Sequence, residues 1–166
     1  MRNKILRLVG LVLAFCVSLT PVVAQEDDNT LHITTPDQLL AFSEACRLDS
    51  YSAGLTVYLD ADLDLTGLDW AGIPLFCGEF DGGGHTISGL SVTGEGSQQG
   101  LFRSLSETAW VHDLTLRGTV APQGSRIQAG GIAGVNTGRI SGCVFDGTVA
   151  GAESVGGIAG RNTVTG

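Results

Sequence analysis

The chain has 166 residues, of which 43% are hydrophobic and 25 are glycine. This length and composition predict a single domain with a core, and they do not imply a disordered chain. Nine basic residues against 17 acidic ones give a net charge of −8, which argues against nucleic acid and anionic membrane surfaces as partners because their phosphates would be repelled.

Residues 1–24 have the pattern of a secretory signal peptide. The apolar run LVGLVLAFCVSL is too short for a membrane-spanning helix. Small residues at Val22 and Ala24 predict cleavage after Ala24. A lipoprotein signal would need a small residue before Cys16, where Phe15 stands. The basic residues of this segment are Arg2, Lys4 and Arg7.

Cleavage would leave residues 25–166, with six arginines, no lysine and 17 acidic residues, and therefore a net charge of −11. No second apolar segment follows, so no membrane span is expected in the mature chain. Three cysteines remain at spacings unlike a zinc site, and an odd number permits at most one internal disulfide. We expect Cys143 to be buried, which leaves Cys46 and Cys77 as the predicted disulfide.

The first predicted element is a helix in TTPDQLLAFSEAC (residues 34–46), within an N-terminal segment of residues 25–54. Thr35 is the expected N-cap, Pro36 suits the first turn, and Gln38 completes a capping box. The apolar face consists of Leu39, Leu40, Phe42 and Cys46. We expect this helix to cover one end of the repeats that follow.

Asp60, Asp62 and Asp64 alternate with apolar residues, which in a strand places three carboxylates on one outer face. One interpretation is a calcium site or a cluster of catalytic acids. The favoured interpretation is a solvated strand face, because Leu65 and Ala71 replace the glycine and glutamate of an EF-hand loop.

Two further groups of residues have both a chemical and a structural interpretation. Asp81 and His85 in FDGGGHTI could form an acid–base pair or simply a turn, and Glu79 with Asp81 could be the two carboxylates of a glycosidase. Trp70 and Trp110 could stack on sugars or pack in the interior. The short loops favour the structural interpretation, so no catalytic residue and no cofactor is predicted. His32 and His112 have no partner within sequence reach.

An apolar-x-x-apolar-x-apolar pattern begins at Ile87 and recurs at Val111 and Ile140, without helical periodicity between the copies. Such a recurrence predicts one turn of a parallel β-helix per copy, over residues 55–166 and roughly five turns in all. At about 4.8 Å per turn, the rod would be about 25 Å long. The residues expected to stack are Ile87 with Val111 and Ile140, Leu90 with Leu114 and Cys143, and Val92 with Leu116 and Phe145.

The phrase GGIAG occurs at residues 130 and 156, which predicts glycines at equivalent corners of successive turns. A phosphate-binding loop would need a following helix and usually a lysine, and this region has neither. The corner glycines are Gly130, Gly131, Gly134, Gly156, Gly157 and Gly160.

GGIAGVNTGRISGCVFDGTVAG (residues 130–151) resembles the GLUG repeat of bacterial exported proteins, and residues 156–166 resemble an incomplete second copy. TPDQLLAF, LTVYLDADLDLTG, FDGGGHTISGL and GLF are similar to the preceding part of such proteins. The resemblance implies an all-β, right-handed parallel β-helix of cell-surface proteins, some of which carry peptidase domains. It implies no catalytic residues.

The expected function is therefore a non-enzymatic module of a secreted, adhesin-like surface protein. The expected partners are a host glycan or protein ligand, or further domains of a longer chain. A fragment of a carbohydrate-active enzyme and an accessory region of a surface peptidase are the alternatives. The sequence stops where another strand should begin, so either the chain is a truncated piece or its end pairs with another strand, which would allow end-to-end self-association.

Overall fold

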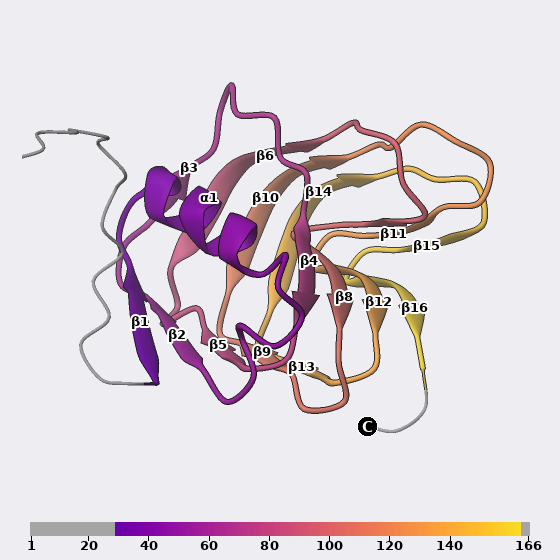
Figure 1. The fold of residues 1–166 in the computed structure, drawn as a ribbon. Coiled ribbons are helices and arrows are strands. Elements are labelled where there is room, and N and C mark those ends of the chain that lie inside the picture. The colour runs from indigo at the N-terminus through magenta and orange to yellow at the C-terminus, as the bar shows by residue number, and fades with distance from the viewer. Residues whose placement is uncertain (1–28, 164–166) are drawn as a thin grey trace, which may run out of the picture.

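A computed structural model describes residues 29–163. The predicted signal peptide and the last three residues lie outside this range. The described chain winds into a parallel β-solenoid, in which every strand pairs in parallel with the strands of the neighbouring turns (Figure 1). One sheet has five strands, one from each successive turn, so the solenoid has about five turns as predicted.

Four sheets form the walls, and each is numbered here in the order in which the chain passes through it. Sheet 1 contains β1 (Thr30–Ile33), β2 (Thr56–Leu59), β5 (Glu79–Asp81), β9 (Trp110–His112) and β13 (Arg139–Ser141). Sheet 2 contains β3 (Leu63–Asp64), β6 (Thr86–Val92), β10 (Thr115–Val120) and β14 (Val144–Val149). Sheet 3 contains β7 (Gln98–Gln99), β11 (Gln128–Gly130) and β15 (Ser154–Gly156). Sheet 4 contains β4 (Ile73–Phe76), β8 (Phe102–Leu105), β12 (Ala133–Asn136) and β16 (Ala159–Asn162).

The core is a column of side chains that point inward from all walls. Alternation along each strand places every second residue inside, where apolar residues are removed from water. Phe76, Phe80 and Phe102 are fully buried, with ring centroids 5.2–6.3 Å apart. Each buried aromatic ring contributes roughly 1.5–3 kcal/mol, so this cluster holds the second and third turns together.

The single described helix, α1 (Pro36–Ala45), covers the first turn as predicted. Thr35 is the N-cap, and its hydroxyl accepts from the Gln38 amide while the Gln38 side chain accepts from the Thr35 amide, which confirms the capping box. Phe42 packs edge-on against Phe76 of β4 at 6.0 Å. The solenoid nevertheless begins at Thr30, before the helix, so β1 lies inside the segment that was expected to precede the repeats.

The predicted stacking is confirmed between the copies of the pattern that begin at Val111 and Ile140. Val111 pairs with Ile140 in sheet 1, and Leu116 pairs with Phe145 in sheet 2. Both pairs have the same offset along the chain, so the inward side chains of one turn lie directly above those of the next.

The predicted stacking is wrong for the segment around Ile87. This residue lies in sheet 2, where it pairs with Leu63 and Leu116, whereas Val111 lies in sheet 1. The same apolar pattern fits a single long strand and a strand that turns a corner, so spacing alone could not assign the wall. The ladders of sheet 2 are Leu63–Ile87–Leu116–Phe145, Leu90–Gly118–Gly147 and Val92–Val120–Val149.

The repeated glycines lie in equivalent positions, because Gly130 pairs with Gly156. Gly131 and Gly157 occupy the bends that follow, whereas the other four lie within strands, and none has a positive φ. A Cβ on Gly134 would lie 2.5 Å from the Gln99 amide nitrogen. At Gly134, close approach of the backbone therefore explains the glycine better than a left-handed corner does.

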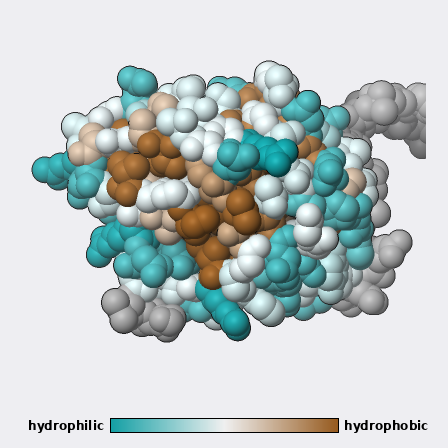
Figure 2. Space-filling model, turned by 180° about the vertical axis from the view of Figure 1, so that it is seen from behind, coloured by the Kyte–Doolittle hydropathy of each residue, from teal (hydrophilic) through white to brown (hydrophobic). Residues whose placement is uncertain are grey.

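The last described turn has a partner on one side only. Its inward residues pack against the core but remain partly exposed, and Figure 2 shows apolar side chains gathered in a patch on the side of the molecule that faces away in Figure 1. The partly buried apolar residues of this turn that pack against the core are Ile140, Cys143, Phe145, Val149 and Ile158.

Candidate functional site

The outer face of sheet 1 carries two straight rows of side chains. Strand alternation sends every second residue outward, and the parallel register aligns these residues from turn to turn. The first row is Thr30, Thr56, Glu79, Trp110 and Arg139. The second row is His32, Tyr58, Asp81, His112 and Ser141. Acidic, aromatic and histidine side chains thus gather on a face supported by a rigid core.

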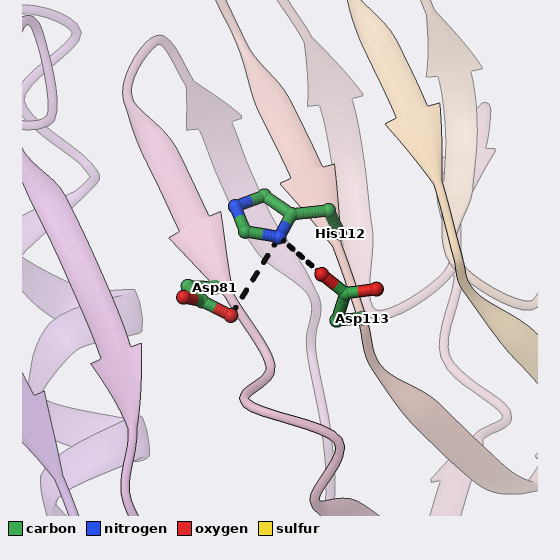
Figure 3. A group of neighbouring side chains, drawn as sticks. All are labelled: Asp81, His112 and Asp113. Atoms are coloured by element: carbon green, nitrogen blue, oxygen red, sulfur yellow. Dashed lines mark hydrogen bonds and ion pairs between the residues drawn. The ribbon is translucent and has the colours of Figure 1, made fainter.

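His112 lies on β9, the fourth strand of this face, and is surrounded by carboxylates. Its Nδ1 atom lies 2.9 Å from Asp113 Oδ2 and 3.6 Å from Asp81 Oδ1 (Figure 3). Its Nε2 atom lies 3.1 Å from Glu79 Oε1. The His112 side chain is only 10% exposed, although it belongs to the outer face. Within residues 29–163, Asp81, His112 and Asp113 form the group whose ligand atoms could hold a metal ion.

The pKa of His112 is raised above its ordinary value of 6.5. Burial by itself would lower this pKa, but hydrogen bonds to Asp113 and Glu79 and the charges of Asp81 and Asp113 outweigh it. The imidazolium form is therefore favoured here, and it is outnumbered by three carboxylates. The site can hold a proton or another cation between Asp81 and Asp113.

Asp113 has an unusual backbone conformation, with a φ of +51°. Among the described residues it is the one non-glycine residue with positive φ. The equivalent position in the next turn is Gly142, with a φ of +62°. A side chain is therefore retained where the corner favours glycine, and this side chain contacts His112.

One aromatic residue, Trp110, packs against the ring of His112. The Trp110 ring lies 4.1 Å from the His112 ring, and the Arg139 guanidinium lies 5.0 Å from the Trp110 ring. Trp110 Nε1 donates to Ser141 Oγ at 2.9 Å, which fixes the indole. These contacts explain why Trp110 is half-buried although it points outward.

The three alternating aspartates do not converge. Asp60 lies 2.6 Å from His32, and Asp64 accepts from the amide and hydroxyl of Thr66. Asp62 accepts from the Thr86 amide, which lowers the pKa of Asp62 together with the hydrogen bond to His85. Residues 60–62 form a turn between β2 and β3 rather than a strand, so the carboxylates point to different partners.

The acid–base interpretation of Asp81 and His85, which the sequence did not favour, is wrong, because the two side chains have different partners. His85 contacts Asp62 at 3.2 Å, whereas Asp81 accepts from the Gly83 amide at 2.8 Å. This hydrogen bond belongs to the turn that the favoured interpretation expected. Glu79 does share the outer face with Asp81, but its carboxylate is used by His112.

The other sequence candidates lie apart from this site. Trp70 is buried, and its Nε1 donates to the Leu101 carbonyl, so it packs in the interior. Cys46, Cys77 and Cys143 are free thiols in the structure, and the predicted Cys46–Cys77 disulfide is not formed in it. Burial raises the pKa of Cys46 to about 12.

Sequence reasoning missed His112 because its partners are distant in the chain. Glu79 lies 33 residues before it and one turn of the solenoid away, and Asp81 lies on the same strand as Glu79. The offset that pairs Glu79 with Trp110 is longer than either interval between the copies of the apolar pattern. Asp113 is adjacent to His112 in the sequence, but it was not recognised there as a partner.

Comparison with known proteins gives a partial similarity. The chain is 36% identical over 86 residues to halomucin of Haloquadratum walsbyi (strain DSM 16790 / HBSQ001). The match covers 51% of this chain but only 1% of halomucin. No protein-family model and no solved structure matches the chain. Within residues 29–163, no helix combines the length and apolar character that crossing a membrane requires.

Proposed function

We propose that the chain is a non-enzymatic β-solenoid module of an exported surface protein, and that sheet 1 displays its ligand-binding face. The observation that carries the proposal is the pair of outward rows on this sheet. Their register is fixed by parallel pairing through all five strands, so a ligand would meet a preformed surface. The similarity to halomucin and the signal-like segment at residues 1–24 support an exported, surface location.

The resemblance to GLUG repeats supports the same proposal. Gly130 pairs with Gly156 and Ala133 with Ala159, so the two copies of GGIAG occupy equivalent places in adjacent turns. Asn136 also stacks on Asn162, with a hydrogen bond of 2.7 Å between their amides. A repeat that stacks in this way suits a spacer or a stalk.

The proposed ligand is a host glycan or a host protein. For a glycan, Trp110 and Tyr58 would supply aromatic faces and Arg139 and Glu79 would supply polar contacts. Further domains of a longer chain, or a second copy, are the proposed partners of the partly exposed last turn.

The test is binding of the purified protein to arrays of glycans and of host extracellular proteins. We expect Trp110→Ala to lose binding at least 10-fold, and Arg117→Ala in sheet 2 to retain it. Binding that is unchanged by Trp110→Ala would refute the assignment of the face. For location, the expressed chain should be exported with Gln25 as its new N-terminus, and retention of residues 1–24 in the cytoplasm would refute export.

A fragment of a carbohydrate-active enzyme is the second candidate, because Glu79 and Asp81 lie on the same face beside Trp110. The same glycans can be assayed for new reducing ends or for unsaturated products. Turnover that is lost in Glu79→Gln would establish the enzyme and overturn the non-enzymatic proposal.

A further inference from the structure

We propose that Asp81, His112 and Asp113 form a binding site for a divalent transition metal ion of the zinc class. The ligand atoms would be Asp81 Oδ1, His112 Nδ1 and Asp113 Oδ2, which face one another in Figure 3. This site differs from the aspartates at positions 60, 62 and 64, and it does not depend on the proposed display function.

The distances suit such an ion. Nδ1 of His112 lies 2.9 Å from Asp113 Oδ2 and 3.6 Å from Asp81 Oδ1, and all three ligand atoms lie within 4.8 Å of one another. A tetrahedral ion with bonds of about 2.0–2.1 Å holds its ligand atoms roughly 3.3 Å apart. Shifts of a few tenths of an ångström would bring these two edges to that value, and the Asp81–Asp113 edge, which is at most 4.8 Å, would have to reach it as well.

Glu79 prepares the histidine for this role. Its carboxylate lies 3.1 Å from Nε2, so it accepts the Nε2 hydrogen and leaves Nδ1 directed at the two aspartates. A carboxylate on the far nitrogen of a ligating histidine is the usual way to fix its tautomer and raise its basicity. Glu79 is thus a positioning residue rather than a ligand.

Charge favours a divalent ion at this position. Three carboxylates, those of Glu79, Asp81 and Asp113, surround one imidazole, and a divalent ion would balance two of their charges. One nitrogen and two carboxylate oxygens suit zinc better than calcium or magnesium, which prefer oxygen ligands only.

The backbone supports the same assignment independently of charge. Asp113 keeps a carboxylate at a φ of +51°, where the next turn has Gly142. The Asp113 side chain is 61% exposed, so an ion can reach the site from solvent. Because Asp81 belongs to β5 and the other two ligands to the following turn, the ion would join adjacent turns of sheet 1.

The experiment is titration of the purified protein with Zn²⁺ by calorimetry, after alkylation of accessible thiols, together with Co²⁺ absorption spectra. We expect one ion bound per chain at this site, a higher melting temperature with zinc, and a Co²⁺ spectrum without a thiolate charge-transfer band. His112→Gln should lose at least 100-fold in affinity, and Glu79→Gln should lose about 10–100-fold.

Two further variants keep the test decisive. Asp113→Gly removes a ligand but places glycine where the backbone favours it, so this variant should fold and still lose at least 10-fold in affinity. His85→Gln is the matched control, because His85 contacts a single aspartate, Asp62, and its loss should leave the affinity unchanged. Undetectable zinc binding by the wild type, or binding that neither His112→Gln nor Asp113→Gly weakens, would overturn the proposal.

Discussion

Comparing Asp113→Gly with Asp113→Ala separates two contributions to the free energy of unfolding: the strain of the backbone at Asp113 and the interactions of its side chain. Both substitutions remove the carboxylate that lies 2.9 Å from His112 Nδ1. Only glycine also relieves the left-handed conformation, with its φ of +51°. We therefore expect the alanine variant to be less stable than the glycine variant, in the presence of a chelator so that no metal contributes.

The magnitude follows from two opposing terms. A residue with a Cβ loses roughly 1–2 kcal/mol in the left-handed region, whereas the flexibility of glycine in the unfolded chain costs roughly 0.5–1 kcal/mol. The stability of the glycine variant should therefore exceed that of the alanine variant by about 0.5–1 kcal/mol. Loss of the hydrogen bond to His112 should cost both variants about 0.5–1 kcal/mol, because the Asp113 carboxylate is 61% exposed and solvent screens it.

The assay is urea unfolding followed by circular dichroism, with thermal melts as a second measure. The expected difference between the two variants corresponds to about 2–4 °C in melting temperature for a domain of this size. Equal slopes in urea would show that the unfolded states are comparable. An alanine variant that equals or exceeds the glycine variant would refute the assignment of strain to this corner.

Four other predictions follow from the described contacts. Since the pKa of His112 is raised from 6.5, its ion pairs should stabilise the metal-free fold fully below pH 6.5 and progressively less as the pH rises through the raised pKa. Urea unfolding across pH 5.5–8.5 should show this trend, and His112→Gln should abolish it. Iodoacetamide at pH 8 should label Cys77 long before Cys46, whose pKa is about 12, and labelling of neither until a reductant is added would instead establish the predicted disulfide. Phe102→Ala should cost about 3–5 kcal/mol in urea unfolding, because its ring is fully buried against two other phenylalanines, and a loss below about 1 kcal/mol would contradict that packing. Backbone amides of residues 156–162 should exchange their hydrogens faster than those of the inner turns, and any self-association measured by sedimentation should strengthen with salt. Strong protection of these amides together with a salt-independent monomer would show that the hydrogen-bonding groups at this end already have partners.

The sequence alone was sufficient to predict the architecture. Period-2 apolar patterns interrupted by glycine leave a chain few options other than stacked turns, and the capping box from Thr35 to Gln38 defines a helix through local hydrogen bonds. The repeated GGIAG phrase also gave the correct offset between the last two turns in sheets 3 and 4, because identical residues occupy equivalent positions there. All of these features depend on neighbours within a few residues or on exact repetition.

The tertiary structure decided which wall each strand joins and, with it, the candidate site. Turns of unequal length shift the register, so Ile87 meets Leu116 rather than Val111, and no local pattern records that shift. In sheet 1, the pairing of β5 with β9 brings Glu79 into contact with His112 across one turn, although 33 residues separate them. Which residues meet across two turns depends on the length and geometry of every corner between them. These corners are fixed only when the core of the solenoid packs.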